Sequence, residues 1–240
     1  MGRPPRTLVL LAISAAVSCS PPTGNTGTSG GGSTNWEGFA LGNDGVESGS
    51  LSLSASTASP RISGPGGGIS LATTDIAASG TYKRSTPTAA TVVLDGVYNP
   101  NTNQIDVSGS GYEFAGVFDG DSRLSGSFTG PGGVVGAFLT EETGATVRVF
   151  CGTFTGDDFG TWNFVVTNLE AHGFAQSATA GPPPTALDGT VDVTGHVIFY
   201  LPGGVIPFAA GDITGNVVTG DWAIPGTGDS GTWRGDTSCD

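Results

Sequence analysis

Basic residues, histidine, cysteine and methionine are all scarce in this chain of 240 residues. Eight lysines and arginines against 21 aspartates and glutamates give a net charge of −13, which disfavours binding to nucleic-acid phosphates and to anionic lipid headgroups. The two histidines, His172 and His196, have no second ligand at metal-site spacing, so we predict no metal site and no cofactor. No serine elbow with acid and histidine partners is present, and we therefore predict no catalytic residue and no enzyme.

An export signal is predicted over residues 1–18. Arg3 and Arg6 give it a positive start, and the apolar run that follows is too short to span a bilayer. The last residues of this signal, Ala-Val-Ser, together with Cys19 resemble a bacterial lipobox, in which the cysteine receives a diacylglycerol after cleavage. We therefore predict a lipoprotein that is attached to a membrane through lipid on Cys19. An ordinary signal peptide cut nearby is the alternative.

Residues 19–34 are predicted to form a flexible, disordered tether, because every residue after Cys19 in this range is Gly, Ser, Thr, Pro or Asn. Loss of the two arginines with the signal makes the mature chain two units more negative, at −15. Ser20 directly after the cysteine is typical of lipoproteins of the outer membrane. The expected location is therefore the cell envelope, on the periplasmic or the exposed side of that membrane.

The composition predicts an all-β protein, since 42 glycines and many Thr, Ser and Val residues accompany few strong helix formers. Short apolar runs alternate with turn clusters, which favours an antiparallel sandwich or up-and-down barrels. The nearest helix candidate, Asn168 to Ala178, is interrupted by Gly173 and keeps no helical period, so we expect a loop or a helical turn there.

Glycine is followed two residues later by an aromatic residue nine times, more often than random placement would give. Positions i and i+2 of a strand share a face, so each pair places a small residue beside a large one. Small barrels fill their interiors in this way, and we therefore favour barrels over an open sandwich. The pairs are Gly80/Tyr82, Gly96/Tyr98, Gly116/Phe118, Gly126/Phe128, Gly136/Phe138, Gly152/Phe154, Gly160/Trp162, Gly220/Trp222 and Gly231/Trp233.

Two similar hairpins, residues 124–138 and 218–233, end the two halves of the chain. We therefore predict two eight-stranded barrel units, over residues 35–145 and 146–240, with a single larger barrel as the alternative. Cys151 lies on the first strand of the second unit and Cys239 just after its last. First and last strands are neighbours in a closed barrel, so we expect a disulfide between these cysteines in an exported protein.

The segment Gly126-Ser-Phe128-Thr-Gly-Pro131, followed by Gly136-Ala-Phe138, resembles the terminal barrel hairpin of transferrin-binding-protein-B-type surface lipoproteins. Thr129 replaces an aromatic residue of that family's pattern, and the loop is shorter. The resemblance covers about fifteen residues. It implies an eight-stranded barrel and a surface lipoprotein, and we carry over neither transferrin nor iron.

The acidic pairs in Asp119-Gly-Asp-Ser122 and at Asp157-Asp158 are predicted to stabilise turns rather than bind calcium, because the full ligand series of a calcium loop is missing. Four tryptophans are candidate ligand contacts, although the Gly-x-aromatic pattern places three of them in a core. They are Trp36, Trp162, Trp222 and Trp233.

Together these features favour a lipid-anchored, non-enzymatic binding protein whose partner is a protein, a glycan or a small molecule. A structural envelope lipoprotein without a soluble ligand is the alternative. A carbohydrate-active enzyme is a third hypothesis, for which Glu141-Glu142 or Asp221 would supply carboxylates.

Overall fold

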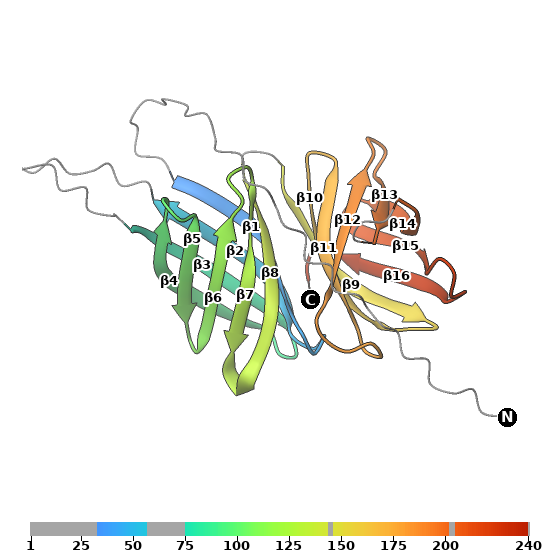
Figure 1. Ribbon diagram of the computed structural model, residues 1–240, viewed down its shortest axis with the longest axis horizontal. Helices are drawn as coiled ribbons and strands as arrows, with labels where there is room; N and C mark the ends of the chain where they lie inside the picture. Colours follow the sequence, from blue (N-terminus) through green and yellow to red (C-terminus); the bar gives the residue numbers. More distant parts are fainter. Residues whose placement is uncertain (1–32, 57–74, 144–145, 202–204, 240) are drawn as a thin grey trace, which may run out of the picture.

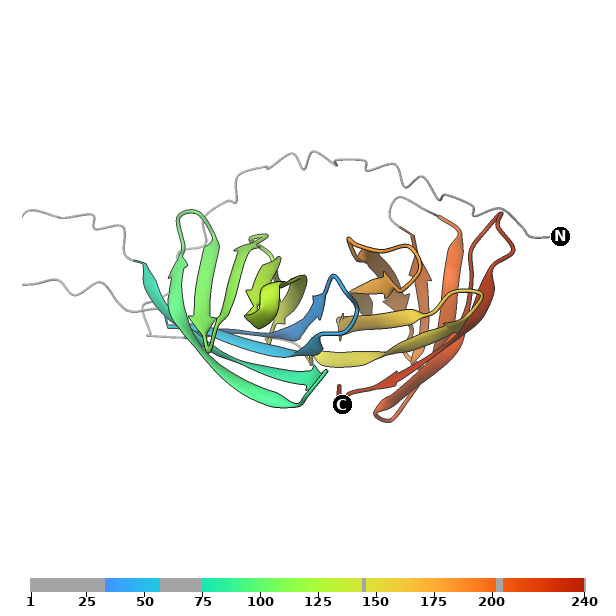
Figure 2. The same ribbon diagram turned by 90° about the horizontal axis from the view of Figure 1, so that it is seen from below.

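The computed structural model describes residues 33–56, 75–143, 146–201 and 205–239, which form two closed antiparallel barrels side by side (Figures 1 and 2). The first barrel consists of β1 (Ser33–Gly42), β2 (Ser48–Ser56), β3 (Ile76–Thr86), β4 (Ala90–Asn99), β5 (Gln104–Gly109), β6 (Tyr112–Phe118), β7 (Arg123–Gly130) and β8 (Val134–Glu142). The second consists of β9 (Arg148–Gly156), β10 (Gly160–Thr167), β11 (Glu170–Ser177), β12 (Thr185–Val191), β13 (His196–Tyr200), β14 (Pro207–Thr214), β15 (Val217–Ala223) and β16 (Ser230–Asp236).

Each barrel is up-and-down, and its first and last strands pair to close it. β1 pairs with both β2 and β8, and β9 pairs with both β10 and β16. The predicted pair of eight-stranded barrels is therefore confirmed, and the sandwich and the single larger barrel were wrong alternatives. The predicted signal peptide, Cys19 and nearly all of the tether lie outside the described residues.

One short 3₁₀ turn, η1 (Pro131–Gly133), is the helical element among the described residues. None of the described segments forms a helix with the length and hydrophobicity that a bilayer crossing requires.

The expectation of a loop or helical turn at Asn168 to Ala178 was wrong, because β11 occupies Glu170–Ser177. Its residues that face the barrel interior are small, among them Ala171 and Gly173. Gly173 lies opposite Phe164 of β10, and a Cβ at Gly173 would lie 2.6 Å from the Phe164 Cβ. The strand therefore needs small inward residues. Because these are not large apolar residues, the sequence lacks the apolar–polar alternation by which a strand is recognised.

The Gly-x-aromatic pairs interlock across three hairpins, so that each ring lies opposite the glycine of the neighbouring strand. The contact is close: a Cβ on Gly136 would lie 2.3 Å from Cε1 of Phe128. Only glycine leaves room for a ring at that separation. The opposed pairs are Gly126/Phe138 and Phe128/Gly136 in β7–β8, Gly152/Trp162 and Phe154/Gly160 in β9–β10, and Gly220/Trp233 and Trp222/Gly231 in β15–β16.

Aromatic rings fill the middle of both barrels. In the first, Phe114 stacks on Phe128 with ring centroids 5.2 Å apart, and Tyr82 packs on Phe114 at 5.4 Å. In the second, Phe164 stacks on Trp162 at 5.0 Å and packs on Phe199 at 5.0 Å. Rings at these distances are in van der Waals contact and leave no room for a ligand between them.

The barrels pack against each other through outward-facing residues of β1 and β8 on one side and β9 to β11 on the other. Phe39, Leu139 and Val165 form the buried apolar centre of this contact, which we call the seam. Beside it, the buried Asn163 amide donates a hydrogen bond to Ser48 Oγ at 2.9 Å. Buried polar groups that are satisfied across the seam fix the orientation of the two barrels.

Candidate functional site

The four tryptophans predicted as ligand contacts all face the barrel interiors. Their side chains are buried, and three of the indole N–H groups donate to backbone carbonyls of other strands, Trp162 to Thr153, Trp222 to Thr155 and Trp233 to Asp221. Trp36 packs on Tyr98 and Phe118, and its indole N–H has no hydrogen-bond partner within the described part of the chain. Their role as ligand contacts stays a prediction.

The predicted disulfide between Cys151 and Cys239 is confirmed, with the Cα atoms 4.7 Å apart. Cys151 pairs with Asp236 at the end of the β9–β16 ladder that closes the second barrel. The bridge therefore fastens the end of the chain to the strand at which the barrel begins.

The acidic turns use their carboxylates for backbone hydrogen bonds. Asp119 Oδ1 accepts from the backbone N–H groups of Asp121, Ser122 and Arg123 at 2.9 to 3.2 Å. Asp157 Oδ2 accepts from the backbone N–H of Ser230. In the described ranges, no group of three His, Cys, Asp or Glu side chains is arranged to hold a metal ion.

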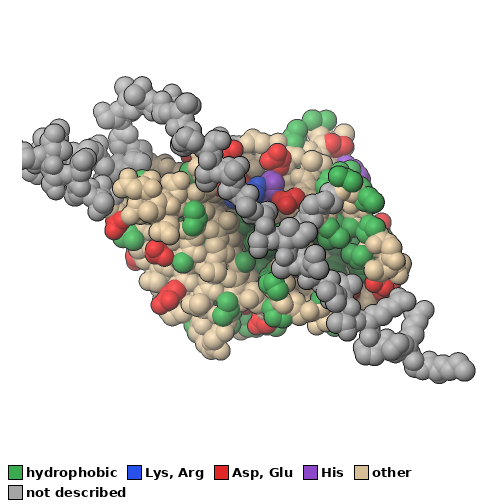
Figure 3. Space-filling model, in the orientation of Figure 1, with side chains coloured by type: hydrophobic (Ala, Val, Ile, Leu, Met, Phe, Trp, Pro, Cys, Tyr) green, Lys and Arg blue, Asp and Glu red, His purple; other side chains and the backbone are tan. Residues whose placement is uncertain are grey.

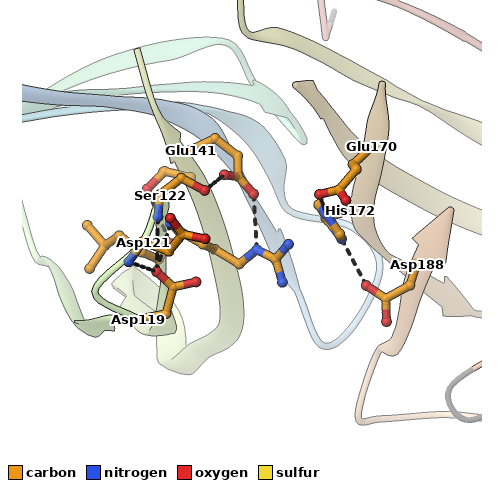
Figure 4. Close-up of polar contacts among 10 residues, drawn as sticks. Asp119, Asp121, Ser122, Glu141, Glu170, His172 and Asp188 are labelled. Carbon is orange, nitrogen blue, oxygen red and sulfur yellow. Dashed lines mark hydrogen bonds and ion pairs between the residues drawn. The ribbon is translucent and has the colours of Figure 1, made fainter. Parts of the chain in front are cut away.

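A polar cluster lies beside the apolar seam, with residues from both barrels (Figure 4). On the first barrel, the buried Glu141 carboxylate accepts from Ser122 Oγ at 2.9 Å and from Arg123 Nε at 3.0 Å. On the second, His172 Nδ1 lies 2.9 Å from Asp188 Oδ1, and its Nε2 lies 3.4 Å from Glu170 Oε2. Figure 3 shows basic, imidazole and acidic side chains gathered at this junction.

The charges of this cluster interact across the seam. The hydrogen bond from His172 lowers the pKa of Asp188, and the positive charge of Arg123 on the other barrel lowers it further. Arg123 thus acts on carboxylates of both barrels. The cluster therefore adds an electrostatic contact to the apolar one, and its groups largely satisfy one another.

Nothing in the sequence analysis singled out the histidines, yet both form the same kind of cross-strand pair with an aspartate. His172 lies opposite Asp188, and His196 lies opposite Asp212 with Nδ1 and Oδ1 2.9 Å apart. Each aspartate follows its histidine by sixteen residues. That repeated spacing is the sequence signal that would have found them.

Replacement of Arg123 by methionine is expected to lower the free energy of unfolding by about 2 kcal/mol, because it leaves the buried Glu141 carboxylate without its charged partner. The loss stays below that of a fully buried pair since Arg123 itself is partly exposed. Urea unfolding measures it. The double variant Arg123→Met/Glu141→Gln should recover most of the stability, and a double variant as unstable as the single one would contradict this account.

A second buried carboxylate, Glu47, belongs to the connection between β1 and β2 at one end of the first barrel. It accepts from Tyr82 OH at 3.3 Å, and Arg84 Nη1 donates to Tyr112 OH at 2.9 Å. Burial raises the pKa of Glu47, against the opposing effects of a Tyr112 hydrogen bond and the Arg84 charge. The folded protein therefore binds this proton more tightly than the unfolded chain does.

Glu47 is expected to contribute stability that is fully present below pH 4.5, its ordinary pKa, and is lost as the pH rises through its higher folded value. Glu47→Gln should therefore raise the melting temperature at pH 7 and flatten its fall between pH 4.5 and neutrality. Calorimetry at a series of pH values measures both. A variant that melts below the parent at pH 7 would contradict the prediction.

Two shallow hollows lie on the outer barrel walls, both floored by strands with inward-facing glycine. The first, of about 470 Å³, is lined by small polar side chains of β1 to β3, among them Ser52, Ser54 and Thr81, and its Glu37 accepts from Ser52 Oγ at 2.7 Å. The second, of about 590 Å³, lies on β13 to β16. Its lining includes His196, Asp212, Thr219, Asp221, Thr232, Trp233 and Arg234.

No protein-family model matches this chain, and no curated protein matches it. Among solved structures, the agglutinin of Burkholderia oklahomensis is similar at 14% identity, over 87% of this chain and 85% of that chain, with a TM-score of 0.17. A TM-score this low carries no argument about this chain. The resemblance of the β7–β8 hairpin to transferrin-binding-protein-B-type lipoproteins stays a prediction.

Proposed function

We propose that this chain is a non-enzymatic binding protein of the cell envelope, held to a membrane by lipid on Cys19, which binds a carbohydrate on the outer walls of its barrels. Membrane attachment rests on the export signal and lipobox of the sequence. The disulfide supports export, because such bridges persist in oxidising compartments.

The filled barrel interiors carry this proposal. Buried rings in mutual contact occupy both barrels, which removes the usual ligand site of a small β-barrel. A partner must then be recognised on the outside, where the linings of both hollows include hydroxyl and carboxyl groups.

The chemistry of the outer walls favours a carbohydrate over a protein or a nucleic acid. Protein interfaces are enriched in exposed aromatic residues, methionine and arginine, whereas Phe159 is the one aromatic residue among the large exposed hydrophobic side chains of the described residues. The excess of acidic residues disfavours nucleic acid. Sugar hydroxyls both donate and accept hydrogen bonds, which suits walls rich in Ser, Thr and Asp.

A glycan microarray probed with the purified full chain tests the proposed function. We expect binding to neutral glycans that persists at high salt, since hydrogen bonds to hydroxyl groups need no counterion release. Failure of the folded protein to bind any glycan would overturn the proposal and favour the structural envelope role.

Mass spectrometry of the protein isolated from its own cells tests the attachment. A diacylglycerol-modified amino-terminal Cys19 is expected. An unmodified terminus at another residue would overturn the lipid anchor and leave carbohydrate binding to be judged by the microarray.

A further inference from the structure

The hollow on β13 to β16 differs from the hollow on the first barrel in what its polar groups already bind. In the first barrel, the Glu37 carboxylate is occupied by Ser52. In the second, neither the Asp221 carboxylate nor the Arg234 guanidinium has a hydrogen-bond partner among the described residues. An acceptor and a donor group without hydrogen-bond partners in the described ranges therefore lie at the same hollow, although the charge of Arg234 also acts on Asp236 of the same strand.

The strand register places these groups around a common centre. Outward-facing His196, Asp212, Thr219 and Arg234 form one row across β13 to β16, and Ala210, Asp221 and Thr232 form the next. Asp221 and Arg234 are diagonal neighbours on adjacent strands, with Cα atoms about 7–8 Å apart. No ion pair joins their side chains in the described part of the chain, so both groups are available to a ligand that lies between them. Ala210 lies opposite Asp221 in the second row, and its short side chain leaves space above the sheet at this point.

Beneath these two rows, glycines bring the strand backbone into close contact with an interior ring. Gly211 and Gly220 lie opposite each other, and a Cβ on either would lie 2.6 Å from the Trp233 indole. The indole therefore lies on the inner side of the backbone at the hollow, whose lining includes residue Trp233. Trp233 is thus the tryptophan whose environment a ligand in this hollow would change.

We propose that this hollow is a binding site for a neutral sugar residue, which rests on the carbohydrate-binding function proposed above. The Asp221 carboxylate accepts from sugar hydroxyls and the Arg234 guanidinium donates to them, while Thr219 and Thr232 do both. His196 has its Nδ1 engaged by Asp212, so its Nε2 remains for the ligand.

The charge and size of the hollow select among ligands. The carboxylates of Asp212 and Asp221 repel an anionic ligand, and the Arg234 guanidinium repels a cationic one. An uncharged polyol meets neither repulsion and therefore fits this set of charges best. A volume of about 590 Å³ falls within the range of small-ligand sites, roughly 300–1,000 Å³. Because the hollow is shallow, it covers one face of a sugar, and the expected dissociation constant is on the order of 1 mM.

Titration of the purified full chain with glucose, galactose, mannose and N-acetylglucosamine, followed by tryptophan fluorescence, tests the site. At least one of these should give a saturable change, and glucuronate should bind more weakly than the corresponding neutral sugar. Asp221→Ala and Arg234→Ala should each weaken binding about tenfold or more, the loss of one hydrogen bond to a charged group. Melting temperatures confirm that the variants fold.

The matched controls are Asp106→Ala and Lys83→Ala, which remove an exposed carboxylate and an exposed cation from strands of the first barrel. Both should leave binding unchanged. Binding that survives both hollow substitutions would overturn this site and leave the carbohydrate function standing. If none of the four sugars binds in the fluorescence titration but the glycan microarray is positive, the site is overturned and the function stands. If neither experiment detects binding, the proposed function is overturned as well.

Discussion

Replacement of both Cys151 and Cys239 by serine is expected to lower the free energy of unfolding of the second barrel by about 4.5 kcal/mol. The bridge joins residues 88 apart, and closing a loop of that length removes conformational entropy from the unfolded chain by about this amount. A domain's whole stability is typically about 5–15 kcal/mol. The variant should therefore be close to unfolding under mild denaturant.

Hydrogen exchange followed by mass spectrometry measures this effect strand by strand. Protection should fall in β9 to β16 and much less in β1 to β8, since the bridge closes only the second barrel. Reduction of the parent protein is the matched control and should reproduce the result. A loss below 1 kcal/mol would show that hydrogen bonds of the β9–β16 ladder alone hold the closure.

Gly152→Ala is expected to cost about 3 kcal/mol, although alanine is ordinarily favoured over glycine within a strand by roughly 0.5–1 kcal/mol. A Cβ at this position would lie 2.4 Å from Cζ2 of Trp162 and 2.2 Å from the backbone oxygen of Arg234. Neither can move without disturbing the barrel closure. Whether Gly152→Ala lowers or raises the free energy of unfolding therefore tests whether glycine is required here to make room for the Trp162 ring.

Thr153→Ala is the matched control, because Thr153 is the next residue of β9 and points outward. It should change the free energy of unfolding by less than about 0.5 kcal/mol. Chemical denaturation of both variants measures the difference. A Gly152→Ala protein as stable as the control would contradict the interlocking of glycines and rings.

The barrels could be predicted from the sequence because their signal is local. A glycine and a ring two residues apart share a face, and turn residues mark the strand ends, so neither inference needs knowledge of distant partners. The disulfide followed from the same topology, since only closure brings Cys151 and Cys239 together.

What stayed hidden depends on register or on long-range contact. Which glycine meets which ring, such as Gly220 and Trp233, is fixed only once the strands are aligned. The seam joins residues far apart in the chain, as with Ser48 and Asn163, and carries no local pattern. β11 was missed because its inward residues are small. The hollows depend on which outward side chains the strand register brings together, which composition does not reveal.

A two-dimensional NMR titration of the isotope-labelled full chain with the same four neutral sugars tests most directly whether the ligand binds outside the filled barrels. We predict shifts of the Asp221, Thr232 and Arg234 amides and of the Trp233 indole N–H. Shifts centred instead on the interior residues Phe114 or Phe164 would contradict the claim that the barrels are packed solid and bind on their outer walls.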